Sequence, residues 1–472
     1  MTNHELGMPF AISQRCEKFL KLVNKPAATL SPDSKKSSLP VVAIIGGGFG
    51  GLSAVRALKD APVQIILIDR TNHHLFQPLL YQVATAGLSP ADIAKPIRSI
   101  LRGQRNVTCV MAEITGIDVE KRQLASPQGN LTYDHLIVAT GARHSYFSHP
   151  EWELLAPGLK SLSDATEIRR RVLTAFEEAE KTEDPDRRRA HMTFVIVGGG
   201  PTGVEMAGAI CELAQHTLTA DFRRIDPKHT RVILVEAGSR ILSTYPEALS
   251  SKAVNQLESL GVEVRLGDPV LNIEAGTVTL KSGPIPCDTV IWAAGNEASG
   301  LAKKIPVETD RQGRAMVRQN LTIPGHPEVQ AIGDIIAIKD KKGNPVPGVA
   351  PAAMQAGEHA GKNISLQLDG KAPTDFWYFD KGSLATIGRH RGIGDLGFIK
   401  LSGTPAWLAW AFIHLFFLIG FRNRLFVFFQ WAFAYITYSR GARLINPKPP
   451  NISKIADKSD SPSGMADRHS RN

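Results

Sequence analysis

Cysteine is scarce in this chain, with four residues in a sequence of 472. Cys16, Cys109, Cys211 and Cys287 are far apart, and no two of them form a Cys-x-x-Cys pair. This spacing argues against a disulfide framework and a redox-active dithiol, and it favours a reducing compartment. The sequence also lacks metal-ligand residues at the spacing of a metal site, so we expect no metal centre.

Two further absences concern export and nucleic acid. The first 30 residues contain no long apolar core, and Glu5 and Glu17 do not suit an acid-poor transit peptide, so we do not expect export. The net charge of +10 suits nucleic acid, an anionic membrane surface or phosphate-bearing ligands. Because neither a helical arginine stripe nor an RNA-binding motif is present, we expect no nucleic-acid partner.

The chain is long enough for two or three domains, each with its own core. Residues 1–39 and 447–472 are rich in Ser, Pro, Lys and Asp, with little apolar periodicity. We expect them to be flexible tails.

The first motif is a strand, a glycine-rich turn and a helix. The apolar run 41–45 leads into Gly46-Gly-Gly-Phe-Gly-Gly51 and then into a segment with helical spacing. In such a fingerprint Gly46 permits the tight turn, Gly48 lets the backbone approach a pyrophosphate, and Gly51 lets the helix pack on the strand. Asp69 ends the next apolar run, where a carboxylate accepts hydrogen bonds from a ribose.

The same order returns in the middle of the chain. The run 193–197 leads into Gly198-Gly-Gly-Pro-Thr-Gly203, in which Gly198, Gly200 and Gly203 repeat the spacing, and a helix should follow. Glu236 ends the next strand, and its carboxylate favours a ribose hydroxyl over a 2′-phosphate, so we expect NADH rather than NADPH. Glu205, in the first turn of this helix, either stabilises the helix dipole or faces the nicotinamide.

Glycine-bearing exits follow two later apolar strands. Ala139-Thr140-Gly141 and Ala293-Ala294-Gly295 are typical of crossovers that return the chain across the nucleotide face. Asp334 follows another strand, where a carboxylate either caps a turn or holds the polyol of a flavin. A helix should begin near Pro351 and direct its positive end at a flavin ring.

Two aromatic, apolar runs lie near the C-terminus, at 406–421 and 425–438, with Arg422-Asn-Arg424 between them. They have 16 and 14 residues, fewer than the roughly 20 that a membrane-spanning helix needs. We expect a hairpin in the membrane interface, with its Trp and Tyr residues at headgroup depth and with Arg440 and Arg443 facing anionic lipid. The alternative is a pair of helices that forms a core or a homodimer interface.

Together these features resemble the type II NADH dehydrogenases, single-subunit NADH:quinone oxidoreductases that do not pump protons. The resemblance covers about residues 40–445 and rests on the two fingerprints, the stretch Arg70–Gly87, Gly333-Asp334 and the aromatic C-terminal runs. It implies an α/β fold with two Rossmann-like domains for FAD and NADH and a C-terminal helical membrane anchor. The implied enzyme transfers a hydride from NADH to FAD and two electrons to a membrane quinone, as a peripheral protein on the cytoplasmic side.

The resemblance also implies roles for residues and segments. FAD would bind the first fingerprint, Asp69, Thr140, Gly141 and Asp334, with Pro78–Gln82 close to the flavin. NADH would bind the second fingerprint, Glu236 and Gly295, and Glu205 would lie near the nicotinamide and flavin. Gln355 and His359 match the quinone-side motif, although His359 stands where the family often has a second glutamine.

The expected organisation then has six parts. They are a tail at 1–39, FAD-binding halves at 40–160 and 300–375, an NADH-binding domain at 161–299, a membrane-anchoring region at 376–446 and a tail at 447–472. Two rival functions remain: a sulfide:quinone oxidoreductase, which needs a cysteine pair beside the flavin, and a non-enzymatic NADH-sensing flavoprotein.

Overall fold

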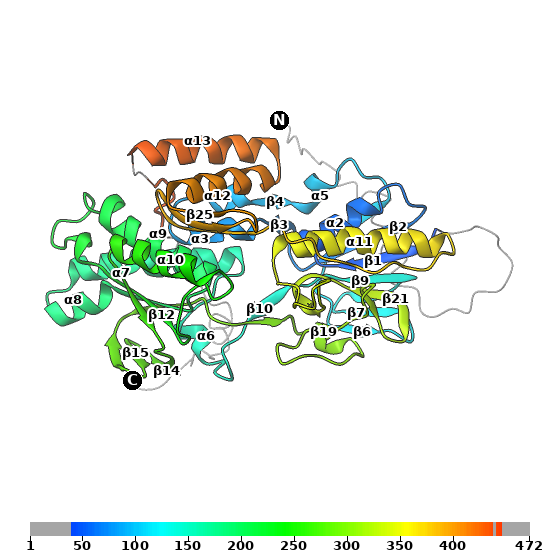
Figure 1. Ribbon diagram of the computed structural model, residues 1–472, viewed down its shortest axis with the longest axis horizontal. Helices are drawn as coiled ribbons and strands as arrows, with labels where there is room; N and C mark the ends of the chain where they lie inside the picture. The colour runs from blue at the N-terminus through cyan, green and yellow to red at the C-terminus, as the bar shows by residue number, and fades with distance from the viewer. Residues whose placement is uncertain (1–38, 438–439, 446–472) are drawn as a thin grey trace, which may run out of the picture.

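The computed structural model describes residues 39–437 and 440–445. Two α/β lobes lie side by side, and a helical hairpin from the C-terminus covers their junction (Figure 1). The expected tails and Cys16 fall outside the described residues, apart from Leu39 in the first tail.

The first lobe is built on a six-stranded sheet in the order β20-β21-β9-β1-β2-β5. Every neighbouring pair is parallel except β20 and β21. The strands are β1 (Val41–Ile45), β2 (Gln64–Asp69), β5 (Val107–Met111), β9 (His135–Val138), β20 (Thr322–Ile323) and β21 (His326–Ala331). Because β20 and β21 come from late in the chain, this lobe is assembled from two separate segments.

Two helices lie along one face of this sheet, α2 (Phe49–Ala57) and α11 (Ala350–Leu368), and Figure 1 shows them side by side. They pack backbone against backbone, because a Cβ on Gly357 would lie 2.1 Å from the carbonyl oxygen of Gly50. A small antiparallel sheet joins the lobe on its other side. Its strands are β6 (Gly116–Asp118), β7 (Gln123–Ser126) and β8 (Gly129–Thr132).

The second lobe repeats the plan on a smaller scale. Its four parallel strands have the order β13-β12-β11-β17. They are β11 (Thr193–Val197), β12 (Arg231–Glu236), β13 (Val262–Leu266) and β17 (Thr289–Trp292). The helices around them are α7 (Leu162–Lys181), α8 (Pro185–His191), α9 (Pro201–Glu212) and α10 (Glu247–Leu260). An antiparallel sheet completes the lobe with β14 (Val270–Glu274), β15 (Thr277–Leu280) and β16 (Gly283–Pro286).

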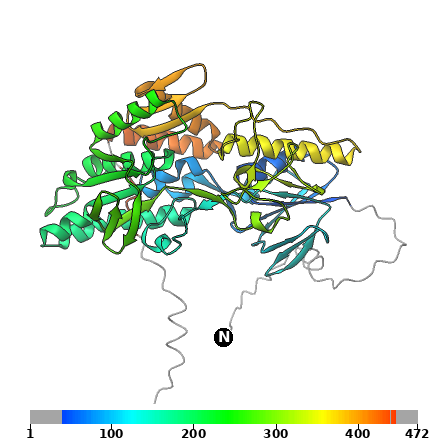
Figure 2. The ribbon, with the colours of Figure 1, turned by 60° about the horizontal axis from the view of Figure 1, so that its bottom comes forward.

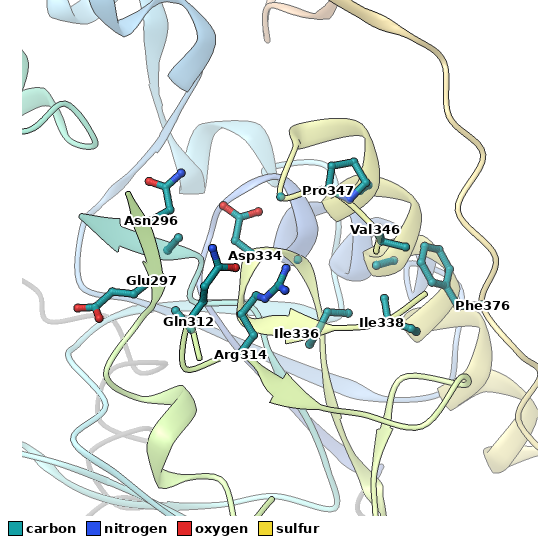
Figure 3. Close-up of a pocket in the computed structure, with 16 residues that line it drawn as sticks. Asn296, Glu297, Gln312, Arg314, Asp334, Ile336, Ile338, Val346, Pro347 and Phe376 are labelled. Carbon is teal, nitrogen blue, oxygen red and sulfur yellow. The ribbon is translucent and has the colours of Figure 1, made fainter. Parts of the chain in front are cut away.

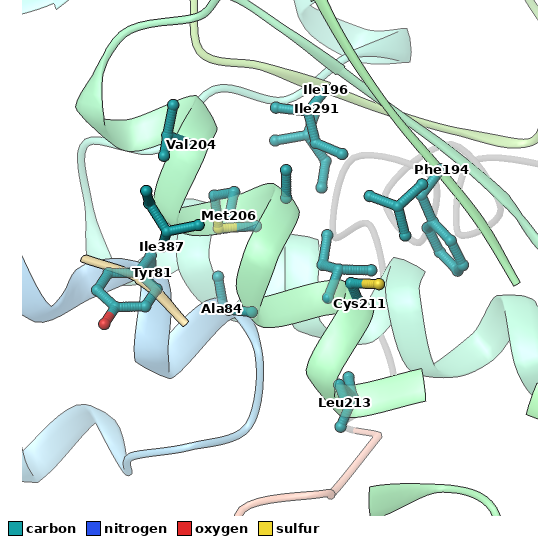
Figure 4. Packing of buried hydrophobic residues seen from close by; sticks show 14 of the residues in the cluster. Tyr81, Ala84, Phe194, Ile196, Val204, Met206, Cys211, Leu213, Ile291 and Ile387 are labelled. Atoms are coloured by element: carbon teal, nitrogen blue, oxygen red, sulfur yellow. The ribbon is translucent and has the colours of Figure 1, made fainter. Parts of the chain in front are cut away.

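Short elements link the lobes. A two-stranded antiparallel pair joins β10 (Ala142–His144) to β18 (Asn296–Ala298). A segment after β2 carries β3 (His73–Leu75), η1 (Gln77–Leu79), α3 (Leu80–Ala84), α4 (Pro90–Ile93), β4 (Ala94–Pro96) and α5 (Ile97–Ile100). The side chains of α3 and α9 share one hydrophobic core (Figure 4).

The C-terminal region begins with an antiparallel sheet that the sequence analysis did not predict, formed by β23 (Ser383–Gly388), β24 (Arg391–Asp395) and β25 (Lys400–Ser402). Its strands are short and contain three glycines in buried or partly buried positions, so they lack an apolar alternation. Two helices follow, α12 (Thr404–Phe417) and α13 (Phe421–Thr437). Figure 2 shows this region against the second lobe and the inner end of α11.

The turn of the helical hairpin lies at 418–420, where Gly420 has a φ of +99°. The polar triplet 422–424 therefore belongs to the first turn of α13 and does not itself form the turn. Among the described residues, none of the helices is both long enough and apolar enough to cross a bilayer.

Candidate active site

The first glycine turn forms a cradle at the N-terminus of α2. Gly46 has a φ of +106°, and its N–H donates to the carbonyl oxygen of Ile68 at 2.7 Å. A Cβ on Gly51 would lie 1.8 Å from the carbonyl oxygen of Gly46, so the helix approaches the strand as only glycine allows. A Cβ on Gly48 would meet no described atom within 4 Å. The backbone at Gly48 is thus open to a phosphate at the positive end of the helix.

Asp69 fixes the shape of this cradle. Its Oδ2 accepts from the N–H of Gly47 at 2.6 Å, and its Oδ1 accepts from the N–H and the hydroxyl of Thr71, each at 2.7 Å. His74 closes the same turn from the other side through a 3.0 Å contact between Nδ1 and the carbonyl oxygen of Gly47. The side chain at the ribose position therefore also holds the glycine backbone in place.

The second cradle has the same construction at the N-terminus of α9. Gly198 has a φ of +110°, and a Cβ on Gly203 would lie 1.9 Å from the carbonyl oxygen of Gly198. A Cβ on Gly200 would meet no described atom within 4 Å. Glu236 takes the role of the acid, accepting from the N–H groups of Gly199 and Gly238, each at 2.7 Å. The second lobe thus has a dinucleotide cradle of its own.

The two glycine exits lie at opposite ends of one antiparallel strand pair, where the N–H of Ser299 donates to the carbonyl oxygen of Gly141 and the N–H of Ser145 donates to that of Gly295. Gly141 and Gly295 have φ values of +66° and +71°, and the residues after them pair in β10 and β18. Across this pair the hydroxyl of Thr140 lies 2.5 Å from that of Ser299. The exits therefore join the first cradle to the second.

Asp334 lines a cavity of about 170 Å³ between β18, η5 (Gly333–Ile335) and the start of α11 (Figure 3). Burial raises the pKa of this carboxyl above its ordinary value, and the ammonium of Lys160 opposes that rise. Lys160 is a residue that the sequence analysis missed, because a lone lysine before a helix carries no motif.

The first turns of α2 and α11 meet at this site. A Cβ on Gly50 would lie 3.1 Å from the carbonyl oxygen of Ala353, so the two helix N-termini lie close together. Pro351 is in the first turn of α11, as its sequence position predicts. The positive ends of two helices therefore stand beside Asp334 and the first cradle, which suits a ligand with a pyrophosphate and a ring that gains negative charge.

Glu205 lies in the first turn and a half of α9, between the lobes and the C-terminal region. The residue as a whole is partly buried, and protein atoms surround its carboxyl group. This burial raises the pKa of Glu205 to about 8, while the backbone N–H of Thr386 and the indole N–H of Trp410 lower it. A buried carboxyl group whose pKa lies near neutral is typical of a functional site.

Trp410 lies near Glu205, a position that the sequence analysis did not predict. Trp410, expected at headgroup depth, is only 3% exposed and packs into the core beside Tyr81 and Trp431. The helical period explains the correction, since α12 has one face toward the sheet β23–β25 and Trp410 stands on that face. Figure 4 shows Tyr81 beside Ile387 and the side chains of α9.

The two arginines that were expected to face lipid are also bound to protein. Arg440 donates to the carbonyl oxygens of Thr85 at 2.8 Å and Ala209 at 3.2 Å, and its guanidinium lies 3.5 Å from Glu212. Arg443 pairs with Asp221. A guanidinium offers five donors, and here backbone and carboxylate oxygens replace its water.

Gln355 and His359 lie on α11 and contact the segment that leads to β23. Gln355 makes two 2.9 Å hydrogen bonds with the backbone of Phe379, one to the carbonyl oxygen and one from the N–H. The Nε2 of His359 lies 2.8 Å from the carbonyl oxygen of Thr374. Both side chains thus hold this segment, and neither is hydrogen-bonded to Glu205 within the described part of the chain.

The described cysteines are free. Cys109, Cys211 and Cys287 take part in no disulfide, and the Sγ of Cys211 donates to the carbonyl oxygen of Leu260. Among residues 39–437 and 440–445, no group of three or more His, Cys, Asp or Glu side chains has the arrangement of a metal site.

The chain matches two family models. Residues 40–357 match the pyridine nucleotide-disulphide oxidoreductase family, and residues 380–439 match the NDH2 C-terminal domain. Two type II NADH:quinone oxidoreductases of Mycobacterium tuberculosis are similar in sequence. One is 43% identical over 87% of this chain and 92% of its own length, and the other is 44% identical over 86% and 89%.

Solved structures show the same fold. NDH2 from Plasmodium falciparum in complex with NADH has a TM-score of 0.78 and 19% identity, covering 86% of this chain and 100% of that one. The sulfide:quinone oxidoreductase of Aquifex aeolicus has a TM-score of 0.64 and 16% identity, covering 82% and 92%. The expected two-domain α/β flavoprotein fold is confirmed. With both family models and two relatives above 40% identity, the chain belongs to the type II NADH:quinone oxidoreductase family.

Proposed function

We propose that this protein oxidises NADH and reduces a quinone at the surface of a membrane, with FAD as its resident cofactor. The observation that carries the proposal is the pair of matching glycine cradles, joined through β10 and β18 and flanked by Glu205. FAD bound in the first cradle would supply the redox chemistry, as an acceptor of a hydride and a donor of two electrons.

The first lobe, built from two segments of the chain, would bind FAD, and the second lobe would bind NADH. Residues 40–160 and 300–375 would hold FAD through Gly46, Gly48, Asp69 and Asp334. Residues 161–299 would hold NADH through Gly198, Gly200 and Glu236. Both pyrophosphates would lie at helix N-termini, which orients the two ligands relative to each other before any reaction.

Glu205 would serve the nicotinamide side of the site. Because its pKa is about 8, the carboxyl group is protonated in most of the molecules at neutral pH. In that state it offers a hydrogen-bond donor to a neutral ligand and places no negative charge beside a hydride donor. Gln355 and His359 would act on the quinone side, by holding the segment 374–379 over α11.

Membrane contact would come from α12 and α13. Their outward faces expose a set of aromatic and aliphatic side chains: Leu408, Phe412, Phe416, Phe426, Phe429, Phe433 and Ile436. A patch of this kind is rare on a protein that stays in water. We propose that the hairpin lies in the interface of the cytoplasmic leaflet as a peripheral anchor. The alternative is that a second copy of the chain covers the same patch in a homodimer.

The decisive experiment uses the holoenzyme in detergent. Anaerobic bleaching of the FAD absorbance is measured with NADH, NADPH and sulfide in turn, and the reduced enzyme is then mixed with a soluble quinone. Rapid bleaching by NADH and reoxidation by quinone are the expected results. Bleaching without quinone turnover would favour a sensor, and bleaching by sulfide alone would overturn the proposal.

A further inference from the structure

Trp410 on α12 is enclosed by aromatic groups from both C-terminal helices and from α3. Its ring stacks on His414 at 4.3 Å between centroids and on Trp431 at 5.7 Å, and it meets Tyr81 edge-on at 6.2 Å. A ring held on three sides in this way has little freedom to rotate. The direction of its N–H group is therefore set by the packing.

That N–H group is buried, and within the described residues it makes no hydrogen bond of full geometry. The polar group that it faces is the carboxyl of Glu205. A buried indole normally has a hydrogen-bond partner, because an unsatisfied buried donor is costly. Glu205 is thus the acceptor that is available to this N–H group.

We propose that Trp410 is a positioning residue for the NADH site, whose indole N–H donates to Glu205 and thereby orients this acid. The inference rests on the proposed function, because the role of Glu205 does. It adds that a helix of the membrane-facing hairpin supplies part of the NADH site, so the seating of the hairpin on the second lobe controls this acid.

One contact fixes the ring stack within α12, and two more tie α13 to α3. The Nδ1 of His414 lies 2.7 Å from the carbonyl oxygen of Trp410; burial lowers the pKa of His414 to about 4, so it is neutral at pH 7 and donates from Nδ1. From α13, the indole of Trp431 donates to Gln82 at 2.8 Å, and Gln82 donates to the hydroxyl of Tyr81 at 2.9 Å. The helix α13 is therefore tied to α3, whose Tyr81 also meets the ring of Trp410.

The other titratable groups around Glu205 are neutral or already paired, so the indole N–H of Trp410 can have a measurable effect on the pKa of Glu205. Tyr81 and Tyr245 both lie within its field, and burial raises the pKa of each phenol well above its ordinary value, so both stay neutral. Glu212, two turns along α9, is paired with Arg440. Besides Trp410, the polar group that favours the ionised form is the backbone N–H of Thr386.

The test substitutes the indole and follows the protonation of Glu205 in the holoenzyme. W410F keeps an aromatic ring but removes the donor. We expect the pKa of Glu205 to rise by about one unit, the effect of one hydrogen bond to a charged group. The measurement is the infrared carboxyl band that disappears in E205Q, recorded as a function of pH, together with the pH profile of FAD bleaching by NADH.

W407F is the matched control, because Trp407 lies one turn earlier on α12 and packs against His390 and Tyr435. It should leave the carboxyl titration unchanged, whereas W410H, which restores a ring N–H, should bring the pKa back to the wild-type value or below it. If W410F loses FAD, the carboxyl titration of Glu205 is still compared between W410H and W407F. An unshifted titration in W410F, or an equal shift in W407F, would overturn the proposal.

Absence of NADH bleaching in the wild type would instead overturn the proposed function, and the carboxyl titration of Glu205 could still be measured.

Discussion

At the scale of single residues, Glu205 links the stability of the fold to pH. Its folded-state pKa of about 8 lies above the ordinary value of 4.5, so the folded state favours the neutral carboxyl. This contribution is fully present below the unfolded-state pKa and is lost as pH rises toward 8. We expect the free energy of unfolding of the wild type, relative to E205Q, to fall by up to about 1.4 kcal/mol per pH unit across that window. Denaturant unfolding at several pH values measures it, and parallel curves for the two proteins would contradict it.

Glu236 gives a second prediction at this scale, on the choice of nucleotide. Its carboxylate holds two backbone N–H groups beside the position of a ribose, where it repels a 2′-phosphate. E236Q removes the charge but leaves an oxygen that accepts one N–H. We expect the ratio of kcat/KM for NADPH over NADH to rise by about tenfold, since about 1.4 kcal/mol of repulsion is relieved. D69N is the matched control at the other cradle, and an unchanged ratio in E236Q would contradict the prediction.

At the scale of elements, the two cradles were predictable because their signals are local. A strand, a glycine turn, a helix and an acid lie within about 40 residues of sequence, and the structure gives a steric reason for Gly46, Gly51, Gly198 and Gly203. Trp410 and Arg440 were not predictable, because their partners are far away in sequence. A tryptophan in an apolar run suits a membrane interface as well as a protein core, and only the seating of α12 on β23 and β24 distinguishes the two.

The contact between α11 and α2 gives the prediction at this scale. A Cβ on Gly357 would lie 2.1 Å from the carbonyl oxygen of Gly50, and backbone cannot move aside as a flexible side chain does. We expect G357A to push the helices apart, to lower the free energy of unfolding by about 1–3 kcal/mol and to weaken FAD retention. G103A is the control, since a Cβ there meets no described atom within 4 Å. Equal stability of the two variants, measured by thermal unfolding with FAD release, would refute this account of the packing.

At the scale of the whole molecule, Arg440 fastens the chain after the hairpin to both α3 and α9. Its guanidinium is buried against Thr85, Ala209 and Glu212, so its removal takes a buried cation and its N–H donors away from that carboxylate and from two carbonyl oxygens. We expect R440Q to lower the free energy of unfolding by about 3 kcal/mol and to speed hydrogen exchange across 404–437. R311Q, at an exposed arginine, should do neither. Unchanged exchange in R440Q would show that the other contacts of the hairpin are enough to hold it.

The exposed apolar side chains of α12 and α13 give the prediction on membrane binding. Phe412 and Phe433 are 71% and 62% exposed, on α12 and α13 respectively. Transfer of each ring out of water is worth about 2 kcal/mol, and a glutamate in its place adds repulsion from anionic lipid. We expect the double variant F412E/F433E to lose at least tenfold in binding to anionic vesicles in a sedimentation assay. Bleaching of FAD by NADH should stay at the wild-type rate, because neither ring contacts a cradle.

A matched control separates loss of membrane contact from a general effect of charge. L154E places the same charge at an exposed leucine of α6 (Trp152–Leu155), on the side of the molecule away from α13 (Figure 1). It should bind vesicles as the wild type does. If F412E/F433E instead keeps its vesicle binding but changes from dimer to monomer in solution, the patch is a subunit interface. The outward-facing rings stand on α12 and α13, and Trp410, which faces Glu205, stands on α12. That outcome would therefore mean that contact with a partner subunit, and not with lipid, holds Trp410 in its position.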